Sequence, residues 1–480
     1  MNIIRKVRYK IGKLFKGSDN VPVVEALKKY KKNPCTGFHI PGHNRGNCIG
    51  ADFKDLMGSE VFAVDSTDEF DNLGTLLPQS GAIEEAQKLA AEAFNSKRTF
   101  FITCGSTIGN ISLALGATKP NDEIVIGRNC HRSVLTGALI SGANPTWLIP
   151  KKLEDWEIFG NIDPKDLENT LKNNKDIKLV WVTNPTYEGV VSDIKEIARI
   201  CKKYNVILAV DEAHGSLWNF SDKLPTSALE QGADLVVHSL HKTGGAMVQS
   251  SLLHISKTSS IDPDKIEAAL KLVHTTSPSM ILTASLDSAR ATLCSKKGQN
   301  AVNSAIENAK FFRNELKKIE NVSVLDEKFG VKVDVTKIFL KIKGLSGKKL
   351  ESILEKLYRI EIESAYDEGI LILSNIGSTR SEFEYLLSAI KNIAQKHYKD
   401  EERTTKLMPL LDPKILMSPR DAYFSPKEYV SKEDAVNRIC TEVIVFCPPG
   451  ISILLPGELI TKEHLPYLTN KDKIEVLKVR

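Results

Sequence analysis

Two short segments place an acid and an amine where one coenzyme could use both. Asp211 directly follows the apolar run 206–210, and Lys242 follows the segment Ala233-Asp-Leu-Val-Val237 by five residues. Each run has the length and composition of a short buried strand, so both side chains are predicted near strand ends. Open α/β sheets bind ligands at the carboxyl ends of their strands. Pyridoxal 5′-phosphate (PLP) uses such a pair, because a lysine forms its Schiff base and an acid keeps its ring nitrogen protonated.

A third segment supplies a place for the phosphate. Residues 100–110 read as a strand, a small-residue turn and a helix start, with Gly105, Ser106 and Thr107 at the turn. Free backbone N–H groups at a helix start face anions, and the two hydroxyls add donors. Taken singly, Asp211 could instead cap a helix and Lys242 could be a surface lysine. We call the turn Gly105-Ser106-Thr107 the predicted phosphate cup. The order of this phosphate cup, the acid and the lysine along the chain is the one used by PLP enzymes of fold type I.

The chain resembles the Orn/Lys/Arg decarboxylases of that fold over about residues 20 to 465. The motifs that carry the resemblance are His39-Ile-Pro-Gly-His43, Gly105-Ser-Thr107, Asn129-Cys-His-Arg-Ser133, Asn184-Pro-Thr-Tyr-Glu-Gly189, Asp211-Glu-Ala-His-Gly215, His238-Ser-Leu-His-Lys242, Thr276-Ser-Pro-Ser279 and Pro448-Pro-Gly-Ile451. The resemblance implies an α/β architecture of PLP-dependent transferase fold type I. Its large domain would hold a mostly parallel sheet, followed by a smaller α+β domain and a C-terminal module.

The resemblance also implies roles for single residues. Lys242, Asp211, His131, His214 and His241 would be catalytic. His131 would stack on one face of the PLP ring and Ala213 would lie on the other, while His214 would contact the substrate carboxylate or the ring hydroxyl. The implied cofactor contacts are Gly105, Ser106, Thr107, His131, Asp211, Ala213, Ser239, His241, Lys242, Thr276 and Ser277, of which the last two would reach the phosphate of a neighbouring subunit in a homodimer or larger homo-oligomer.

Simpler structural roles stay open for several of these residues. His131 could be a buried, hydrogen-bonded histidine, and the Thr276–Ser279 segment could be a turn that caps the next helix at Ser279. His39 and His43 alone would suggest a metal site without a third ligand, so no metal is expected.

Composition is typical of a soluble cytoplasmic enzyme. The net charge of +5 comes from 65 basic and 60 acidic residues, which gives no reason to expect a nucleic-acid partner. The eight cysteines include no C-x-x-C pair, so neither zinc nor disulfides are indicated. Residues 1–17 are basic and amphipathic, and could lie on a membrane or, more simply, pack on the body or on a partner subunit.

Alternating strand and helix patterns from about residue 80 to 255 predict the mostly parallel sheet. Helices are expected over 83–93 and 193–204, and strands over 123–126 and 178–183. Beyond residue 303, helices over 305–319 and 347–357 and strands over 322–325, 337–342 and 370–374 predict the smaller domain. The expected division is a basic arm (1–35), a PLP-binding large domain (36–300), a small α+β domain (301–398) and a C-terminal domain (399–480) that begins with a charged linker.

The substrate-selecting positions depart from the family pattern. The family commonly has paired aspartates where this chain reads Asn72-Leu-Gly-Thr-Leu-Leu77, and acids occur earlier, at Asp65, Asp68, Glu69 and Asp71. Further departures are Leu217-Trp218, Met280 and Ser452. No N-terminal wing domain is expected, because His39 comes so near the start, so the chain is similar to the short, biosynthetic arginine decarboxylases.

The function implied by the resemblance is α-decarboxylation of a basic amino acid, with arginine first and lysine or ornithine next, to give CO₂ and a polyamine precursor. The alternatives are an aminotransferase or lyase reaction, or a substrate without a basic tail, because fold alone does not fix the reaction. A catalytically inactive regulatory paralogue is the third hypothesis.

Overall fold

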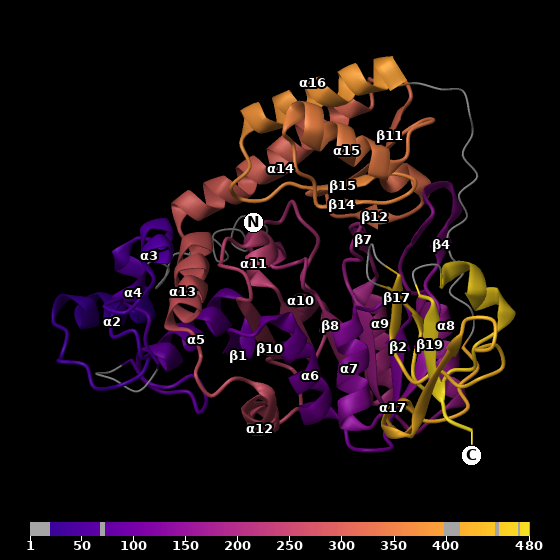
Figure 1. Ribbon diagram of the computed structural model, residues 1–480, viewed down its shortest axis with the longest axis horizontal. Helices are drawn as coiled ribbons and strands as arrows, with labels where there is room; N and C mark the ends of the chain where they lie inside the picture. Colours follow the sequence, from indigo (N-terminus) through magenta and orange to yellow (C-terminus); the bar gives the residue numbers. More distant parts are fainter. Residues whose placement is uncertain (1–19, 68–72, 398–412, 447–450, 469–470, 480) are drawn as a thin grey trace, which may run out of the picture. The chain divides into compact units, whose positions relative to one another are not determined.

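The computed structural model describes residues 20–67, 73–397, 413–446, 451–468 and 471–479 (Figure 1). The chain forms two compact units: unit 1 comprises Met1–Gly116 and Glu212–Asn303, and unit 2 comprises Ala117–Asp211 and Ser304–Arg480. The basic segment 1–17, the charged linker 399–406 and the acids at 68, 69 and 71 lie outside the described residues.

Unit 1 contains three antiparallel strands in the order β1-β10-β9. Their bounds are β1 (Ser96–Ile102), β9 (Leu235–His238) and β10 (Ser251–Ser256). The helices are α2 (Pro22–Lys32), α3 (Ala51–Met57), α4 (Ser59–Phe62), α5 (Gly81–Ala93), α6 (Gly105–Ala117), α10 (Ala228–Gln231), α11 (Leu240–Thr243), α12 (Pro263–Val273) and α13 (Met280–Cys294). Helix α5 confirms the alanine-rich helix predicted from residue 83, with its alanines 86, 90 and 91 buried.

Unit 2 contains four parallel strands in the order β8-β6-β2-β3. They are β2 (Glu123–Gly127), β3 (Asn144–Leu148), β6 (Ile177–Thr183) and β8 (Ile207–Asp211), and the helices that alternate with them are α7 (Arg132–Ser141), α8 (Pro164–Asn173) and α9 (Ile194–Tyr204). Strands β2 and β8 are nearly all buried, as expected of parallel strands covered on both faces, whereas β3, at the end of the strand order, is only partly buried. Helix α9 begins where Asp193 accepts a hydrogen bond from the Glu196 N–H, and ends at Asn205 in the left-handed region.

The C-terminal part of unit 2 consists of short paired strands. They are β16 (Lys427–Ser431) with β19 (Lys473–Leu477), and β17 (Ile444–Phe446) with β18 (Ile451–Leu454), preceded by α17 (Pro419–Phe424). Arg128, just past β2, donates to both carboxylate oxygens of Glu458 at 2.7 and 2.9 Å, and both side chains are buried. This pair joins the C-terminal strands to the parallel sheet within unit 2.

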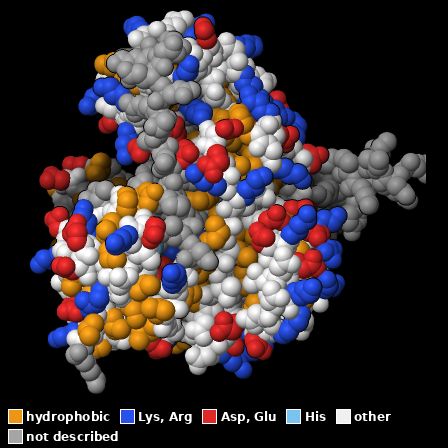
Figure 2. Space-filling model, turned by 90° about the vertical axis from the view of Figure 1, so that its right-hand side faces the viewer, with side chains coloured by type: hydrophobic (Ala, Val, Ile, Leu, Met, Phe, Trp, Pro, Cys, Tyr) orange, Lys and Arg blue, Asp and Glu red, His pale blue; other side chains and the backbone are white. Residues whose placement is uncertain are grey.

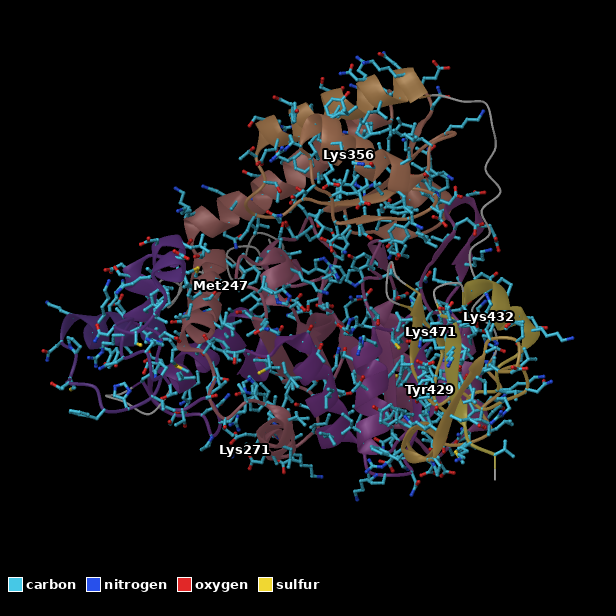
Figure 3. All side chains as sticks on the ribbon, viewed as in Figure 1. Met247, Lys271, Lys356, Tyr429, Lys432 and Lys471 are labelled. Atoms are coloured by element: carbon cyan, nitrogen blue, oxygen red, sulfur yellow. The ribbon has the colours of Figure 1, made fainter. Side chains whose placement is uncertain are left out.

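On the face shown in Figure 2, hydrophobic side chains form patches among charged ones. On the C-terminal strands, Tyr429 is 64% exposed (Figure 3). In the described parts of the chain, no helix combines the length and apolar character needed to cross a membrane.

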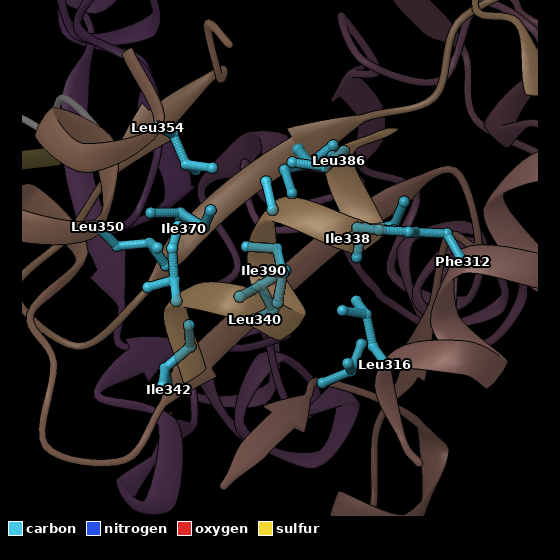
Figure 4. Packing of buried hydrophobic residues seen from close by; sticks show 14 of the residues in the cluster. Phe312, Leu316, Ile338, Leu340, Ile342, Leu350, Leu354, Ile370, Leu386 and Ile390 are labelled. Atoms are coloured by element: carbon cyan, nitrogen blue, oxygen red, sulfur yellow. The ribbon is translucent and has the colours of Figure 1, made fainter. Parts of the chain in front are cut away.

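The smaller α+β layer in unit 2 has the antiparallel order β11-β13-β15-β14. Its strands are β11 (Val322–Val324), β13 (Lys337–Ile342), β14 (Ser364–Ala365) and β15 (Ile370–Leu373). Its helices are α15 (Gly347–Tyr358), α16 (Arg380–His397) and α14 (Lys296–Leu316), of which residues 296–303 belong to unit 1. Side chains of the sheet and of the helices, including Phe312, Leu340, Ile370 and Ile390, pack together in a buried hydrophobic core (Figure 4). Helix α14 begins nine residues before the predicted start, within a polar stretch that carries no apolar periodicity.

Four further short strands complete unit 2. They are β4 (Lys152–Leu153) paired with β5 (Ile158–Phe159), and β7 (Val190–Val191) paired with β12 (Lys332–Val333).

Candidate active site

Lys242 lies in a one-turn helix directly after a buried strand. Helix α11 follows β9, and the Lys242 side chain is partly exposed. Its Nζ lies 2.9 Å from Nε2 of His214, which is 8% exposed. The lysine predicted to form the Schiff base is therefore held beside an imidazole that can exchange a proton with it.

The segment predicted to bind phosphate begins helix α6. Gly105 has φ +76°, and a Cβ added there would meet nothing within 4 Å, so the space before the helix is open. The Ser239 hydroxyl donates to Oγ of Ser106 at 2.8 Å, while Thr107 is exposed. Because a helix leaves its first N–H groups without intrahelical partners, this end suits an anion. Within unit 1, the predicted cup and the predicted lysine segment thus meet through Ser106 and Ser239.

His241 is fixed in one orientation by the backbone. Its Nδ1 lies 2.9 Å from the Ser250 carbonyl oxygen, so Nδ1 carries the proton and donates. Burial lowers the pKa of His241 from its usual range, and nearby Lys242 lowers it further. A neutral imidazole at this position can accept a proton through Nε2.

Asp211, described within unit 2, is the last residue of β8 and is 4% exposed. It ends a strand and starts no helix, so the alternative in which it caps a helix is not observed. Its carbonyl oxygen accepts a hydrogen bond from the Asn184 N–H at 3.0 Å. The predicted position of this acid, at the carboxyl end of a parallel strand, is correct.

His131, also in unit 2, caps helix α7. Its Nδ1 accepts from the Ser133 N–H at 3.2 Å and lies 2.8 Å from the Ser133 hydroxyl, and the residue forms a β-bridge with Ile451. The residue is exposed within the described structure, so the alternative of a buried histidine is not observed, although the expected hydrogen bonding is. One ring nitrogen is thereby fixed by Ser133.

The Thr276–Ser279 segment leaves its first hydroxyls exposed. Thr276 and Ser277 are exposed in this chain, and Ser279 caps helix α13 by accepting from the Leu282 N–H. The predicted cap is confirmed. Contact of Thr276 and Ser277 with a second subunit's cofactor stays a prediction.

The two histidines of His39-Ile-Pro-Gly-His43 have separate partners. His43 Nε2 lies 3.2 Å from Oδ2 of Asp65, and its Nδ1 accepts from the Gly46 N–H at 3.0 Å. His39 Nδ1 lies 2.6 Å from the carbonyl oxygen of Ile40. Among the residues that the structure describes, no three His, Cys, Asp or Glu side chains gather as metal ligands.

Several residues that the sequence did not single out hold the site segments in place. The Thr103 N–H donates to His274 Nε2 at 3.2 Å, just before the predicted phosphate cup. A hydrogen bond with the same histidine lowers the pKa of the neighbouring Cys104. Glu212, between Asp211 and Ala213, is fully buried and bonded to His238. The hydrogen-bond partners in these pairs are far apart in sequence. The sequence signal for Glu212 and His238 was their position inside the family motifs.

Comparison with solved structures defines the fold. The lysine decarboxylase LdcF of Francisella novicida superimposes with a TM-score of 0.83 at 21% identity, covering 96% of this chain and 81% of that one. At lower similarity, an alanine–glyoxylate aminotransferase of Nostoc matches with a TM-score of 0.52. The predicted class, an α/β PLP-dependent transferase of fold type I with a mostly parallel sheet, is confirmed.

Comparison of sequences defines the family. The family Orn/Lys/Arg decarboxylase matches with its major domain over residues 21–343 and with its C-terminal domain over residues 402–475. A protein of Bacillus subtilis named arginine decarboxylase is 33% identical over 93% of this chain and 92% of its own length, and one from Bacillus anthracis is similar to the same degree. The chain belongs to the Orn/Lys/Arg decarboxylase family, as its motifs predicted.

Proposed function

We propose that this protein is a PLP-dependent α-decarboxylase of a basic amino acid, with arginine the first substrate to expect and lysine or ornithine the next. The observation that carries the proposal is the Lys242–His214 contact at 2.9 Å, in the same unit as the Ser106–Ser239 contact at the start of α6. The family membership and the relatives named arginine decarboxylase support it. The product would be CO₂ and an amine that serves as a polyamine precursor.

The residues present fit PLP. The open helix start at Gly105, with Ser106, Thr107 and Ser239, would take the phosphate, and Lys242 would hold the aldehyde carbon. Asp211 would keep a proton on the ring nitrogen, while His131 and Ala213 would lie against the two ring faces. When bound, PLP supplies an electron sink for the pair released as CO₂ leaves. These assignments extend the sequence prediction and are part of the proposal.

Two histidine side chains would then transfer protons during the reaction. His214 is close enough to Nζ of Lys242 to take and return the proton of that amine. His241, with Nδ1–H bonded to the Ser250 carbonyl, presents a basic Nε2. Decarboxylation leaves a carbon that must be protonated, and either imidazole has the chemistry to supply that proton.

We also propose a homodimer or larger homo-oligomer in the cytoplasm, with Thr276 and Ser277 contributing to the neighbouring site. The division into an arm, large domain, small domain and C-terminal domain at residues 35, 300 and 398 is part of the same proposal. Only the separate C-terminal domain is supported by a family match of its own, over residues 402–475, since the major-domain match runs from residue 21 to residue 343.

A panel of amino acids tests the function. Purified protein loaded with PLP is incubated with each of the twenty amino acids and with ornithine, and CO₂ and amines are followed by mass spectrometry. The proposal predicts CO₂ from arginine, lysine or ornithine and none above background from neutral residues. Keto acids in place of CO₂ would indicate an aminotransferase, and no product at all would favour an inactive paralogue.

A further inference from the structure

A network of buried polar side chains in unit 1 adjoins the segments that carry the predicted site residues. Glu212, His238, His254 and Thr99 are each at most 1% exposed. His238 Nε2 lies 2.8 Å from Glu212 Oε1, His238 Nδ1 lies 3.1 Å from His254 Nε2, and His254 Nδ1 lies 2.8 Å from the Thr99 hydroxyl. Buried polar groups are costly unless they are bonded, so four such residues in series call for an explanation.

Glu212 is the fixed end of this chain. Its Oε1 also accepts from the Ser227 hydroxyl at 2.7 Å, and its Oε2 accepts from the Ala228 N–H at 2.7 Å. With these donors on the carboxylate, His238 donates through Nε2. One consistent arrangement then has His254 donating to His238 and Thr99 donating to His254, so that every hydrogen bond points toward Glu212. Burial holds the pKa of His254 well below its usual range, which agrees with a neutral ring.

The two ends of the Glu212–His238 bond belong to the two segments that the site needs. Glu212 lies between Asp211 and Ala213, two residues before His214. His238 ends β9 and precedes Ser239, four residues before Lys242. Backbone bonds run beside it, from the Glu212 N–H to the Val237 carbonyl and from the Ser239 N–H to the Ala213 carbonyl. The side-chain bond therefore ties the turn that carries His214 to the segment that carries Lys242.

Glu212 packs closely against the turn that follows it. A Cβ added to Gly215 would lie 2.6 Å from Cγ of Glu212, which explains why a glycine is needed at this place in Asp211-Glu-Ala-His-Gly215. On the other side of the chain, the Phe94 ring packs against both His238 and His254 at centroid distances of 5.3 and 4.8 Å. The carboxylate and both imidazoles are thus held by close packing as well as by hydrogen bonds.

We infer that Glu212, through His238 and His254, is a positioning residue that sets the spacing of His214 and Lys242 and so prepares the site for PLP. This inference rests on the proposed function, since it concerns the same cofactor. The role is carried by hydrogen bonds in a fixed geometry, and the negative charge of Glu212 is not required. A glutamine can serve in its place, because its oxygen can accept from Ala228 while its NH₂ donates to Ser227 and His238, with the chain reversed in direction.

The experiment compares Glu212→Ala with Glu212→Gln in the full chain. The dissociation constant of PLP is measured by titrating the apoprotein and following visible absorbance and circular dichroism, and the melting temperature is recorded beside it. Glu212→Ala should weaken PLP binding by about tenfold or more, because it leaves buried donors unpaired. Glu212→Gln should bind within about threefold of the parent, as expected when all three bonds are kept.

A matched control separates positioning from general stability. Asp287 is also fully buried and accepts bonds from the Val23 N–H and from Arg290, neither of which is among the predicted site residues. Asp287→Ala should lower the melting temperature yet leave PLP affinity near that of the parent. If Glu212→Ala does not fold, Gly215→Ala tests the inference in its place. The added Cβ would displace Glu212 without removing a polar group, so this variant should also weaken PLP binding.

Three results would overturn the inference. These are parent-like PLP affinity in Glu212→Ala or in the deciding Gly215→Ala, equal defects in Glu212→Ala and Glu212→Gln, or an Asp287→Ala variant that loses affinity as much as Glu212→Ala. A parent protein that fails to bind PLP would instead contradict the proposed function, so the two failures are distinguishable.

Discussion

Nζ of Lys242 and Nε2 of His214 lie 2.9 Å apart, on two segments that are 28 residues apart in sequence. At this distance one nitrogen can donate a hydrogen bond to the other, and two cations this close in a partly buried site would repel each other. The pair is a reason to expect a reactive amine at Lys242.

Lys242→Ala should abolish the visible absorbance of the PLP-bound protein, since a lysine amine is required to bind the aldehyde carbon. Lys356→Ala, at an exposed lysine on α15, is the control and should leave the spectrum unchanged (Figure 3). Borohydride reduction followed by peptide mapping locates the modified lysine. A PLP adduct on any other residue would contradict the assignment of the site.

Asp211→Asn should retain PLP but lose about a hundredfold or more in kcat, because the amide keeps the volume and removes the charge that favours the protonated ring nitrogen. Asp193→Asn is a matched control, since asparagine is as good a helix N-cap as aspartate. Steady-state rates at saturating PLP measure the effect. Parent-like turnover in Asp211→Asn would mean that the reaction does not depend on this charge.

The acids Asp65, Asp68, Glu69 and Asp71 are expected to include the group that recognises the basic end of the substrate. Neutralising them one at a time should reveal at least one variant whose KM for a dibasic amino acid rises about ten- to a hundredfold. Asp65→Asn is the first to make, because this carboxylate is partly exposed and is held by His43. Four variants with the parent's KM would indicate recognition by other residues.

The stability of the C-terminal strands should depend on pH through His464. This histidine closes a capping box with Thr461, and burial lowers its pKa in the folded protein. Between the lowered folded pKa and the unfolded value near 6.5, the unfolded chain binds more protons, so stability falls as the pH falls below about 7.

His464→Gln keeps the usual capping-box acceptor and removes this titration. Melting temperatures of the parent and of His464→Gln should agree at pH 8. At pH 5 the melting temperature of the parent should be lower than that of His464→Gln by on the order of 2 °C. A constant difference across this range would show that His464 does not contribute to the pH dependence.

Residues whose role depends on local sequence were predictable. Asp211 at a strand end, the Gly105 turn before a helix and the Ser279 cap all follow from patterns within about ten residues, and the structure agrees. The Glu212–His238–His254–Thr99 chain was not predictable, because its members come from three strands and a turn, and Thr99 and His254 are 155 residues apart. The early start of α14 at Lys296 was missed because its first turns are polar.

The central claim is that the chain releases the α-carboxyl group of a basic amino acid as CO₂. Arginine labelled with ¹³C at the carboxyl carbon, incubated with the PLP-loaded protein, measures this most directly. The account predicts one ¹³CO₂ for each molecule of agmatine formed, no 2-oxo acid, and loss of both products in Lys242→Ala. Labelled carbon retained in a 2-oxo acid, or no turnover of arginine, lysine or ornithine, would contradict it.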